Sequence, residues 1–248
     1  MLRQDDLGNG YRIWQDTTQF CFGIDAVLLA HYGHPAEGGR ALDLGCGNGI
    51  IPLLLAADLK KAGITAQLTG LEIQAEAAAL AERSVRENGL TDTITIVRGD
   101  LREASSLFKR DSFSYITCNP PYFAAGTGLQ SSAPARAIAR QEICCTLEDV
   151  VREASGLLKM SGHLAMVYRP FRMAGLFILL GKYGLEPKRM RLVCPHPDEA
   201  PSLFLIEAVR GGKPGLTVEA PLIVRDAAGR YTDELLAIYG MKDVKEEP

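Results

Sequence analysis

The segment of this chain best suited to chemistry is an N-P-P-Y run made of Asn119, Pro120, Pro121 and Tyr122. It follows the apolar, strand-like run FSYITC, and proline neither donates to a sheet ladder nor favours a helical residue before it. We therefore expect Asn119 at a strand tip, where its side-chain oxygen and the Pro120 carbonyl form paired acceptors. Such a pair suits a planar amine such as adenine N6, which becomes nucleophilic only as its nitrogen pyramidalises. Tyr122 offers the base a flat face, and Phe123 a second wall.

A glycine-rich loop, GCGNG, follows the strand-like run ALDL and forms the second candidate site. Gly45, Gly47 and Gly49 permit a tight strand-to-helix turn that brings bare backbone, including that of Cys46, close to a ligand. The G-x-G-x-G spacing does not meet the dinucleotide fingerprint, because Ile50 occupies the position of its third glycine. The loop also lacks the Lys and Ser/Thr pair of a phosphate-binding loop.

Three acidic residues, Asp43, Glu72 and Asp100, end three successive predicted strands. In a parallel sheet they converge on one edge, which suits a cationic ligand that carries hydroxyls and an amine. S-adenosylmethionine meets this description, with Glu72 on the ribose hydroxyls, Asp100 on the adenine amine and Asp43 toward the methionine ammonium. The adjacent Ile73 and Leu101 are assigned to the same pocket. The alternatives are acids that only cap the following helices and an N-P-P turn that only ends a strand.

Apolar strand-like runs alternate with helix-like segments from residue 40 onward. This alternation predicts an α/β fold with a doubly wound, mostly parallel sheet of seven strands, closed by an antiparallel hairpin. The fourth strand should lie beside the first, so that Asn119 faces the same crevice as the glycine loop. We expect an N-terminal appendage over residues 1–39 with a hairpin arm and a helix, one domain over 40–240, and a frayed acidic tail over 241–248.

Composition is ordinary for a globular protein, with 47% hydrophobic and 23% charged residues. No run approaches the roughly 20 apolar residues that cross a bilayer, and the N-terminus lacks a signal pattern, so we expect a cytoplasmic protein without membrane association. The six cysteines match neither a disulfide framework nor a zinc site, and we expect reduced thiols and no metal.

Charge is unevenly distributed along the chain, although the net charge is only −3. Residues 1–129 carry 11 Lys and Arg against 15 Asp and Glu, whereas residues 130–230 carry 14 against 10. The basic half contains Arg136 and Arg140 shortly after the N-P-P-Y run. A face that follows a phosphate backbone has this character, and so does an ordinary solvated surface.

With these residues placed, the chain resembles the class I S-adenosylmethionine-dependent methyltransferases that carry an N-P-P-Y motif, which have a Rossmann-like fold. Within them it is similar to the bacterial tRNA (adenine-N6) methyltransferases that modify the adenine beside the anticodon of valine tRNA. The similar segments are FGIDAVLLA, ALDLGCGNGIIPLLLA, GLEIQ, RGD, CNPPYF, ARQE and LFLIEAVRGGKPGL. The resemblance implies S-adenosylmethionine as cofactor and tRNA as substrate, with Phe20 and Asp25 near the cofactor. Phe123, Arg136 and Arg140 are assigned to substrate binding, with pairing of Arg140 to Glu142 as an equal alternative to an RNA phosphate contact, and the oligomeric state stays open.

Other acceptors share this chemistry. An N-P-P-Y site also fits a methyltransferase acting on a protein glutamine amide or on adenine N6 in DNA. Glutamine methyltransferases usually carry a sizeable helical N-terminal domain, for which residues 1–39 leave little room. A cofactor-binding RNA-binding factor without catalysis is a further alternative, and the intact run from Asn119 to Tyr122 argues against it.

Overall fold

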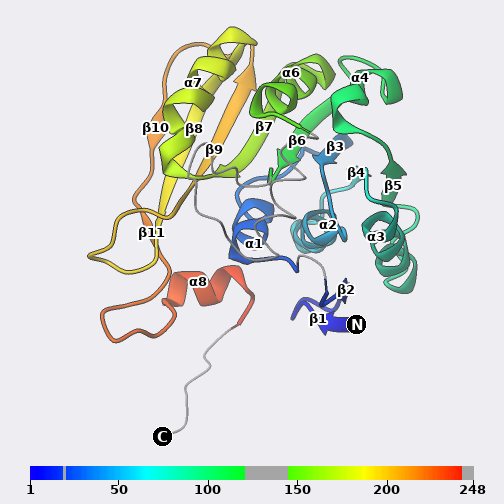
Figure 1. The fold of residues 1–248 in the computed structure, drawn as a ribbon, viewed down its shortest axis with the longest axis horizontal. Coiled ribbons are helices and arrows are strands. Elements are labelled where there is room, and N and C mark those ends of the chain that lie inside the picture. Colours follow the sequence, from blue (N-terminus) through cyan, green and yellow to red (C-terminus); the bar gives the residue numbers. More distant parts are fainter. Residues whose placement is uncertain (19–20, 121–144, 242–248) are drawn as a thin grey trace, which may run out of the picture.

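The sheet at the centre of the molecule carries the candidate site. The computed structural model describes residues 1–18, 21–120 and 145–241. Seven long strands run through the sheet in the order β8-β9-β7-β6-β3-β4-β5 (Figure 1). In chain order they are β3 (Gly39–Leu44), β4 (Ala66–Glu72), β5 (Ile94–Arg98), β6 (Phe113–Cys118), β7 (Leu158–Tyr168), β8 (Leu185–Cys194) and β9 (Leu203–Arg210).

Only β9 runs against the other long strands, pairing antiparallel with β7 on one side and with β8 on the other. The remaining neighbours among these strands pair in parallel, including β3 with β6, as the alternating pattern predicted. The doubly wound, mostly parallel fold is confirmed. The sheet is wider than the seven predicted strands, because the two-residue strands β10 (Thr217–Val218) and β11 (Leu222–Ile223) pair with β8.

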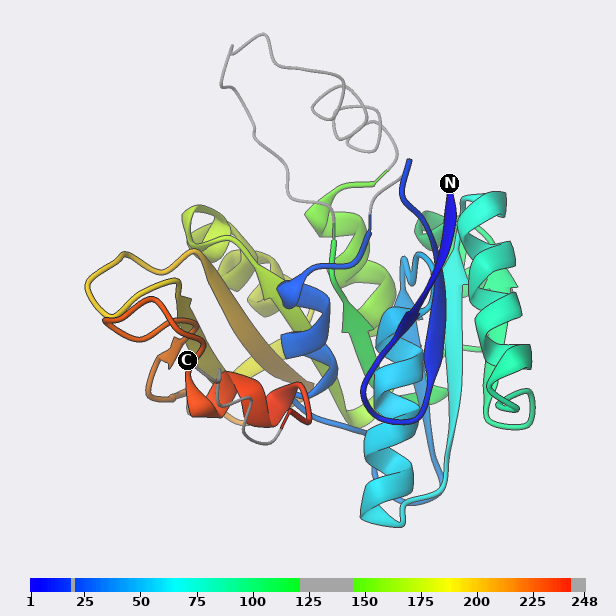
Figure 2. The same ribbon diagram turned by 90° about the horizontal axis from the view of Figure 1, so that it is seen from below.

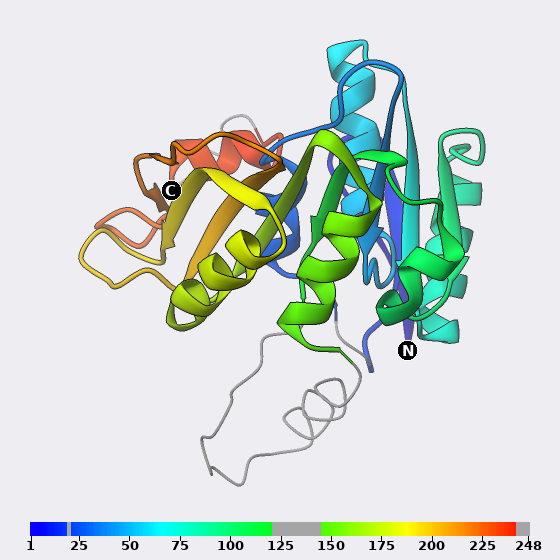
Figure 3. The same ribbon diagram turned by 90° about the horizontal axis from the view of Figure 1, so that it is seen from above.

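Helices cover both faces of the sheet, as the connections between parallel strands require (Figures 1, 2 and 3). One layer holds α1 (Ile24–Ala30), α2 (Ile50–Ala62) and α3 (Ala75–Glu87), and the other holds α4 (Ala104–Leu107), α6 (Leu147–Leu157) and α7 (Met173–Lys182). The core is correspondingly split into two hydrophobic clusters. The short helix α8 (Asp233–Ile238) lies beside β11. Two 3₁₀ turns, η1 (Leu101–Glu103) and η2 (Pro170–Arg172), precede α4 and α7.

The N-terminal segment contains the predicted arm and helix. Strands β1 (Leu2–Asp6) and β2 (Arg12–Asp16) form a separate two-stranded antiparallel sheet that packs on α3 (Figure 2). Helix α1 follows and packs on α2 and β7, so this segment reaches the centre of the sheet. The division into segments 1–39, 40–240 and 241–248 stays a prediction, and residues 242–248 lie outside the described part.

Helix α6 shows how tertiary pairing sets a boundary. The helix-like pattern runs on to Gly162, but α6 ends at Leu157 and β7 begins at Leu158. Leu158 pairs with Phe113 of β6, so the residues that the local pattern assigns to a helix belong to the sheet instead.

Among the described residues, no helix combines the length and apolar character that a membrane span needs.

Candidate active site

The glycine loop between β3 and α2 adopts a conformation that only glycine enters readily. Gly45, Gly47 and Gly49 have φ values of 75°, 55° and 86°, all in the left-handed region. A Cβ atom at Gly45 or Gly47 would meet nothing within 4 Å, so the backbone at both positions is open to a ligand. A Cβ atom at Gly49 would lie 3.1 Å from Cβ of Ala81 on α3, so this glycine lets α2 and α3 approach each other.

Cys46 occupies the loop with its backbone only. Its side chain is buried, with Sγ only 2.7 Å from where a Cβ atom on Gly70 would lie. Burial raises the pKa of the Cys46 thiol well above its usual range, and the nearby Asp43 adds to the effect. The sulfur is therefore a packing group, and any contact of Cys46 with a cofactor would come from its main chain.

Glu72, at the end of β4, is buried and holds the loop in place. Its Oε2 accepts a hydrogen bond from the Gly47 amide at 2.9 Å, and its Oε1 accepts one from the Gln74 amide at 2.8 Å. Each carboxylate oxygen keeps a further lone pair for a ligand hydroxyl. Glu72 therefore supports the backbone at the start of α3 and remains able to bind a diol, so the two interpretations of this acid are compatible.

Asp43, at the end of β3, is only 2% exposed. The Thr117 hydroxyl on β6 donates to its Oδ1 at 2.7 Å, whereas its Oδ2 is buried with no hydrogen-bond partner among the described residues. Burial raises the pKa of Asp43 to about 7, and the charge of Glu72 adds to this, while the Thr117 hydrogen bond opposes it. A buried carboxylate oxygen without a partner is costly, so a proton or a cationic ligand at Oδ2 would stabilise this group.

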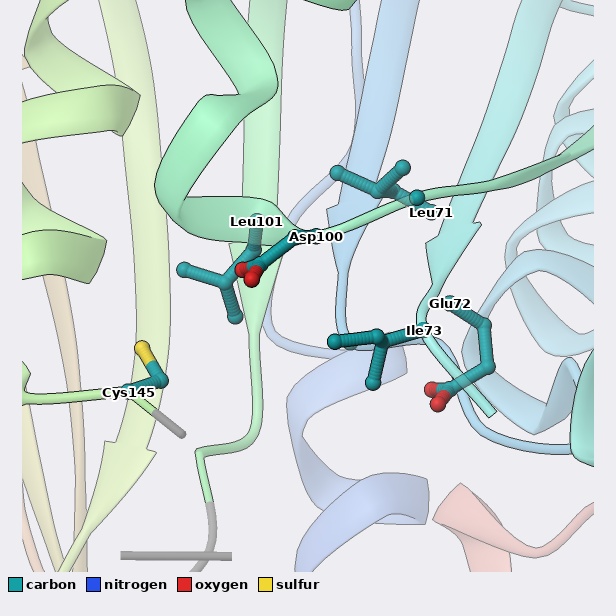
Figure 4. Close-up of a pocket in the computed structure, with 8 residues that line it drawn as sticks. Leu71, Glu72, Ile73, Asp100, Leu101 and Cys145 are labelled. Carbon is teal, nitrogen blue, oxygen red and sulfur yellow. The ribbon is translucent and has the colours of Figure 1, made fainter. Parts of the chain in front are cut away.

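A pocket opens between the ends of β4 and β5 and the start of α6 (Figure 4). It has a volume of about 50 Å³ and is lined by Gly45, Leu71, Glu72, Ile73, Gly99, Asp100, Leu101 and Cys145. Ile73 is 46% exposed here, so its apolar side chain is accessible to a flat ring that binds in the pocket. Complete ligand pockets commonly measure about 300–1,000 Å³. This pocket therefore suits one ring of a larger ligand whose remainder lies over the glycine loop.

Asp100 is already engaged by its neighbour two residues on. Its Oδ1 accepts from the Arg102 amide at 2.9 Å, and its Oδ2 accepts from Arg102 Nε at 2.9 Å and Nη2 at 2.5 Å. The Arg102 hydrogen bond lowers the pKa of Asp100. This acid therefore caps η1, as the alternative interpretation expected, and an adenine amine would have to share the carboxylate with Arg102.

Asn119 lies immediately after β6, beside the glycine-loop strand. Its Nδ2 donates to Oδ2 of Asp25 at 3.1 Å, and Asp25 is itself buried in the first turn of α1. Pro120, the next residue, is buried. Asp25 was predicted to lie near the cofactor, and the structure places its carboxylate against the predicted catalytic amide.

Part of the predicted site lies outside the described residues. This applies to Phe20, Pro121, Tyr122, Phe123, Arg136 and Arg140. The described part brings Asp25, Asp43, Glu72, Asp100 and Asn119 to the carboxyl ends of neighbouring strands, while their assigned roles stay predictions. Within the described residues, no group of three or more His, Cys, Asp or Glu is arranged to hold a metal ion.

Thr117 and Cys145 contribute to this site although neither was predicted from the sequence. Thr117 is a strand residue without a motif, and only the β3–β6 register places it opposite Asp43. Cys145 enters the pocket from the start of α6, 45 residues after Asp100, and no local pattern links the two. Burial, followed by the charge of Asp149, raises the pKa of Cys145 to about 12, so its thiol stays neutral and apolar.

The fold and this site together define a class I methyltransferase: a doubly wound sheet with one antiparallel long strand, and acids and a glycine loop at the carboxyl ends. The family model of the methyltransferase small domain matches residues 22–178, and the chain belongs to this family. The match includes α1, the glycine loop and the N-P-P-Y run.

Curated relatives cover almost the whole chain. A tRNA1(Val) (adenine(37)-N6)-methyltransferase of Porphyromonas gingivalis is 31% identical over 228 residues, which is 87% of this chain and 86% of the relative. A protein of the same name from Parabacteroides distasonis is 28% identical over 230 residues, or 92% of each chain.

Solved structures agree on the fold. A predicted O-methyltransferase from Agrobacterium tumefaciens superposes with a TM-score of 0.70 at 26% identity, covering 88% of this chain and 96% of that one. A geranyl diphosphate C-methyltransferase from Streptomyces coelicolor, solved with S-adenosyl-L-homocysteine, has a TM-score of 0.54 at 15% identity over 74% of this chain and 78% of that one. The second likeness concerns the fold alone.

Proposed function

We propose that this protein is an S-adenosylmethionine-dependent methyltransferase that methylates the N6 amine of an adenine in tRNA, next to the anticodon. The observation that carries the proposal is the position of Asn119 and Pro120. They follow β6, which pairs directly with β3, the strand that leads into the glycine loop. The proposed site for the amine and the proposed cofactor site therefore lie at the carboxyl ends of two paired strands, which favours the proximity that transfer between two bound molecules requires.

The residues at the cofactor site fit S-adenosylmethionine. Oδ2 of Asp43, which has no hydrogen-bond partner among the described residues, suits a cationic ligand. Each carboxylate oxygen of Glu72 keeps a lone pair that can accept from a ribose hydroxyl. Gly45 and Gly47 leave space for a ligand against bare backbone, and Ile73 offers an apolar wall for a purine. The bound cofactor supplies an electrophilic methyl group on a sulfonium.

The acceptor residues hold and orient the amine. Oδ1 of Asn119 and the main-chain oxygen of Pro120 accept its two N–H groups, so that the nitrogen lone pair turns toward the methyl group. Two acceptors match an amine, which has two hydrogens to donate, better than a hydroxyl, which has one. The site therefore favours a nitrogen as the atom that receives the methyl group. The description of the Agrobacterium protein as an O-methyltransferase implies an oxygen instead. Tyr122 remains the predicted surface on which the base stacks.

A nucleic-acid substrate fits the surface beside the acceptor site. Strand β7 runs parallel to β6, so the turn η2 lies at the same sheet edge as Asn119. Phe171 in this turn is 66% exposed, and Arg172 follows it directly in the chain. An exposed aromatic ring offers stacking to a base, and an arginine next to it in the chain offers charge to phosphates. The curated relatives are named for a valine tRNA, which supports a valine tRNA as the substrate. With tRNA as its substrate, the enzyme is proposed to act in the cytoplasm.

The test is transfer of labelled methyl groups to defined acceptors. The full chain is incubated with labelled S-adenosylmethionine and tRNA from a strain that lacks this modification, and the tRNA is digested to nucleosides. We expect label in N6-methyladenosine, and a matched tRNA with the target adenine replaced by guanine should take up none. Label in a protein or DNA fraction, or in no fraction, contradicts the proposal.

A further inference from the structure

The contact between Asp25 and Asn119 joins two parts of the chain that are 94 residues apart. Oδ2 of Asp25 accepts from Nδ2 of Asn119 at 3.1 Å, while Oδ1 of Asp25 accepts from the Ala26 amide at 3.0 Å. Asp25 is 7% exposed and lies in the first turn of α1. Its carboxylate is therefore anchored at one oxygen by its own helix and presents the other to the Asn119 amide.

We infer that Asp25 is a positioning residue that fixes which end of the Asn119 amide faces the acceptor amine. The inference rests on the proposed role of Asn119 as an amine acceptor. A side-chain amide has a donor end and an acceptor end of nearly the same shape, and the two exchange when it rotates by half a turn. A carboxylate only accepts, so it holds the NH₂ group, and Oδ1 is left to point away from Asp25.

The negative charge adds a second effect. A hydrogen bond from the NH₂ group to a carboxylate polarises the amide and increases the negative charge on its oxygen. The acceptor amine gains positive charge as the methyl group is transferred, and a more negative Oδ1 stabilises that charge. Asp25 thus acts on the reaction through Asn119, without having to touch the substrate.

Gly23 gives independent support, because it leaves the space that Asp25 fills. A Cβ atom at Gly23 would lie 2.7 Å from Oδ1 of Asp25, which is closer than real Cβ contacts. The φ of Gly23 is −112°, a value open to every residue, so a side chain at this position would meet the Asp25 carboxylate and no backbone restriction. Gly23→Ala therefore displaces the carboxylate without removing its charge.

The first experiment separates positioning from cofactor binding. Asp25→Asn and Gly23→Ala are compared with the wild type for kcat on tRNA and for the Kd of S-adenosylhomocysteine. We expect kcat to fall roughly 10- to 100-fold in both, because the Asn119 amide loses its charged partner or its alignment. The Kd should stay within about twofold, since the cofactor-binding acids are untouched. A large rise in Kd with little change in kcat overturns the inference and supports the predicted cofactor role of Asp25.

Asp58→Asn is the matched control for α1. His31, which follows α1, contacts Asp58 of α2 at 2.5 Å, so this substitution removes a carboxylate contact at the other end of the same helix. It should leave kcat unchanged, and the Tm of both variants is measured so that any loss of stability can be compared. A comparable loss of kcat in Asp58→Asn means that packing of α1 accounts for the effect, and it contradicts a positioning role.

An exchange of the two side chains gives the sharpest test. Asn119→Asp alone places two carboxylates within hydrogen-bond distance, and their repulsion should disturb the site. Adding Asp25→Asn restores a donor opposite an acceptor, and either oxygen of an Asp at 119 can face the amine. Asp25→Asn should therefore lower kcat in the wild type and raise it in the Asn119→Asp background. If it lowers kcat in both backgrounds, Asp25 acts independently of Asn119 and the inference fails, whereas a wild-type enzyme that methylates no RNA contradicts the proposed function itself.

Discussion

The Thr117 hydroxyl reaches across the β3–β6 pair to one oxygen of Asp43 at 2.7 Å, and the other oxygen of Asp43 has no partner among the described residues. The buried carboxyl group at the start of the glycine loop therefore has a hydrogen-bond partner for only one of its two oxygens. Burial raises its pKa to about 7. At neutral pH this acid is therefore present in both its neutral and its charged form, and a bound cation would shift its protonation toward the charged form.

Cofactor affinity should depend on pH through Asp43. The pKa of about 7 is raised above the ordinary 3.8, so the folded protein holds an extra proton between these values, and the contribution of Asp43 to stability falls as pH rises through them. A ligand ammonium favours the charged carboxylate. S-adenosylhomocysteine should therefore bind roughly tenfold more tightly at pH 8 than at pH 6. Calorimetry in buffers of different ionisation enthalpy should detect the released proton.

Asp43→Asn is the control for this pH dependence. An amide at position 43 does not titrate, so the affinity should become nearly independent of pH over the same range and no proton should be released at this site. Equal affinity of the wild-type protein at pH 6 and pH 8 would show that Asp43 does not sense the ligand.

Glu72→Gln should weaken cofactor binding first. The glutamine amide has a donor end, which cannot replace both acceptor contacts to the Gly47 and Gln74 amides, and it loses the charge that suits a ribose diol. We expect the Kd of S-adenosylhomocysteine to rise roughly 10- to 100-fold, with kcat at saturating cofactor changed much less. Glu76→Gln, an exposed position in the first turn of α3, is the matched control and should bind normally.

Asn119→Ala should have the opposite profile. It removes the side-chain acceptor for the amine and leaves the glycine loop and the acids in place. Turnover should fall by about 10²- to 10³-fold, the usual effect of losing one preorganised group that stabilises transition-state charge. Binding of S-adenosylhomocysteine, measured in parallel, should stay nearly unchanged. A collapse of cofactor binding or of Tm would instead identify Asn119 as a structural residue.

Phe171→Ala and Arg172→Ala should raise KM for tRNA. Loss of base stacking or of a phosphate contact weakens RNA binding, and we expect roughly a 5- to 100-fold increase for Phe171→Ala. Arg172→Ala should also lower the slope of log binding constant against log salt concentration by the equivalent of about one phosphate contact. Ile178→Ala removes another exposed apolar side chain, 72% exposed and further along α7, and should leave KM unchanged. Equal effects at Phe171 and Ile178 would contradict RNA docking at η2.

Local sequence determined much of the fold and the cofactor site. Alternating apolar runs predict parallel strands and covering helices because each element must bury one face or both. Three glycines at alternate positions predict a left-handed turn, and the φ values of Gly45, Gly47 and Gly49 follow from that chemistry. The acids at the strand ends could be placed at one edge without coordinates, since parallel strands end together.

Tertiary structure decided what those residues contact. Thr117 reaches Asp43 only through the register of β3 and β6, and Asp25 reaches Asn119 only because α1 packs on the sheet. Even the end of α6 was set by pairing of Leu158 with β6 and not by helix propensity. Short-range preferences act on neighbours in the chain, whereas burial, charge and orientation at this site depend on groups brought together by packing. The sequence therefore determined which chemical groups were available, and only the folded chain decided which oxygen has a partner and which amide is held in place.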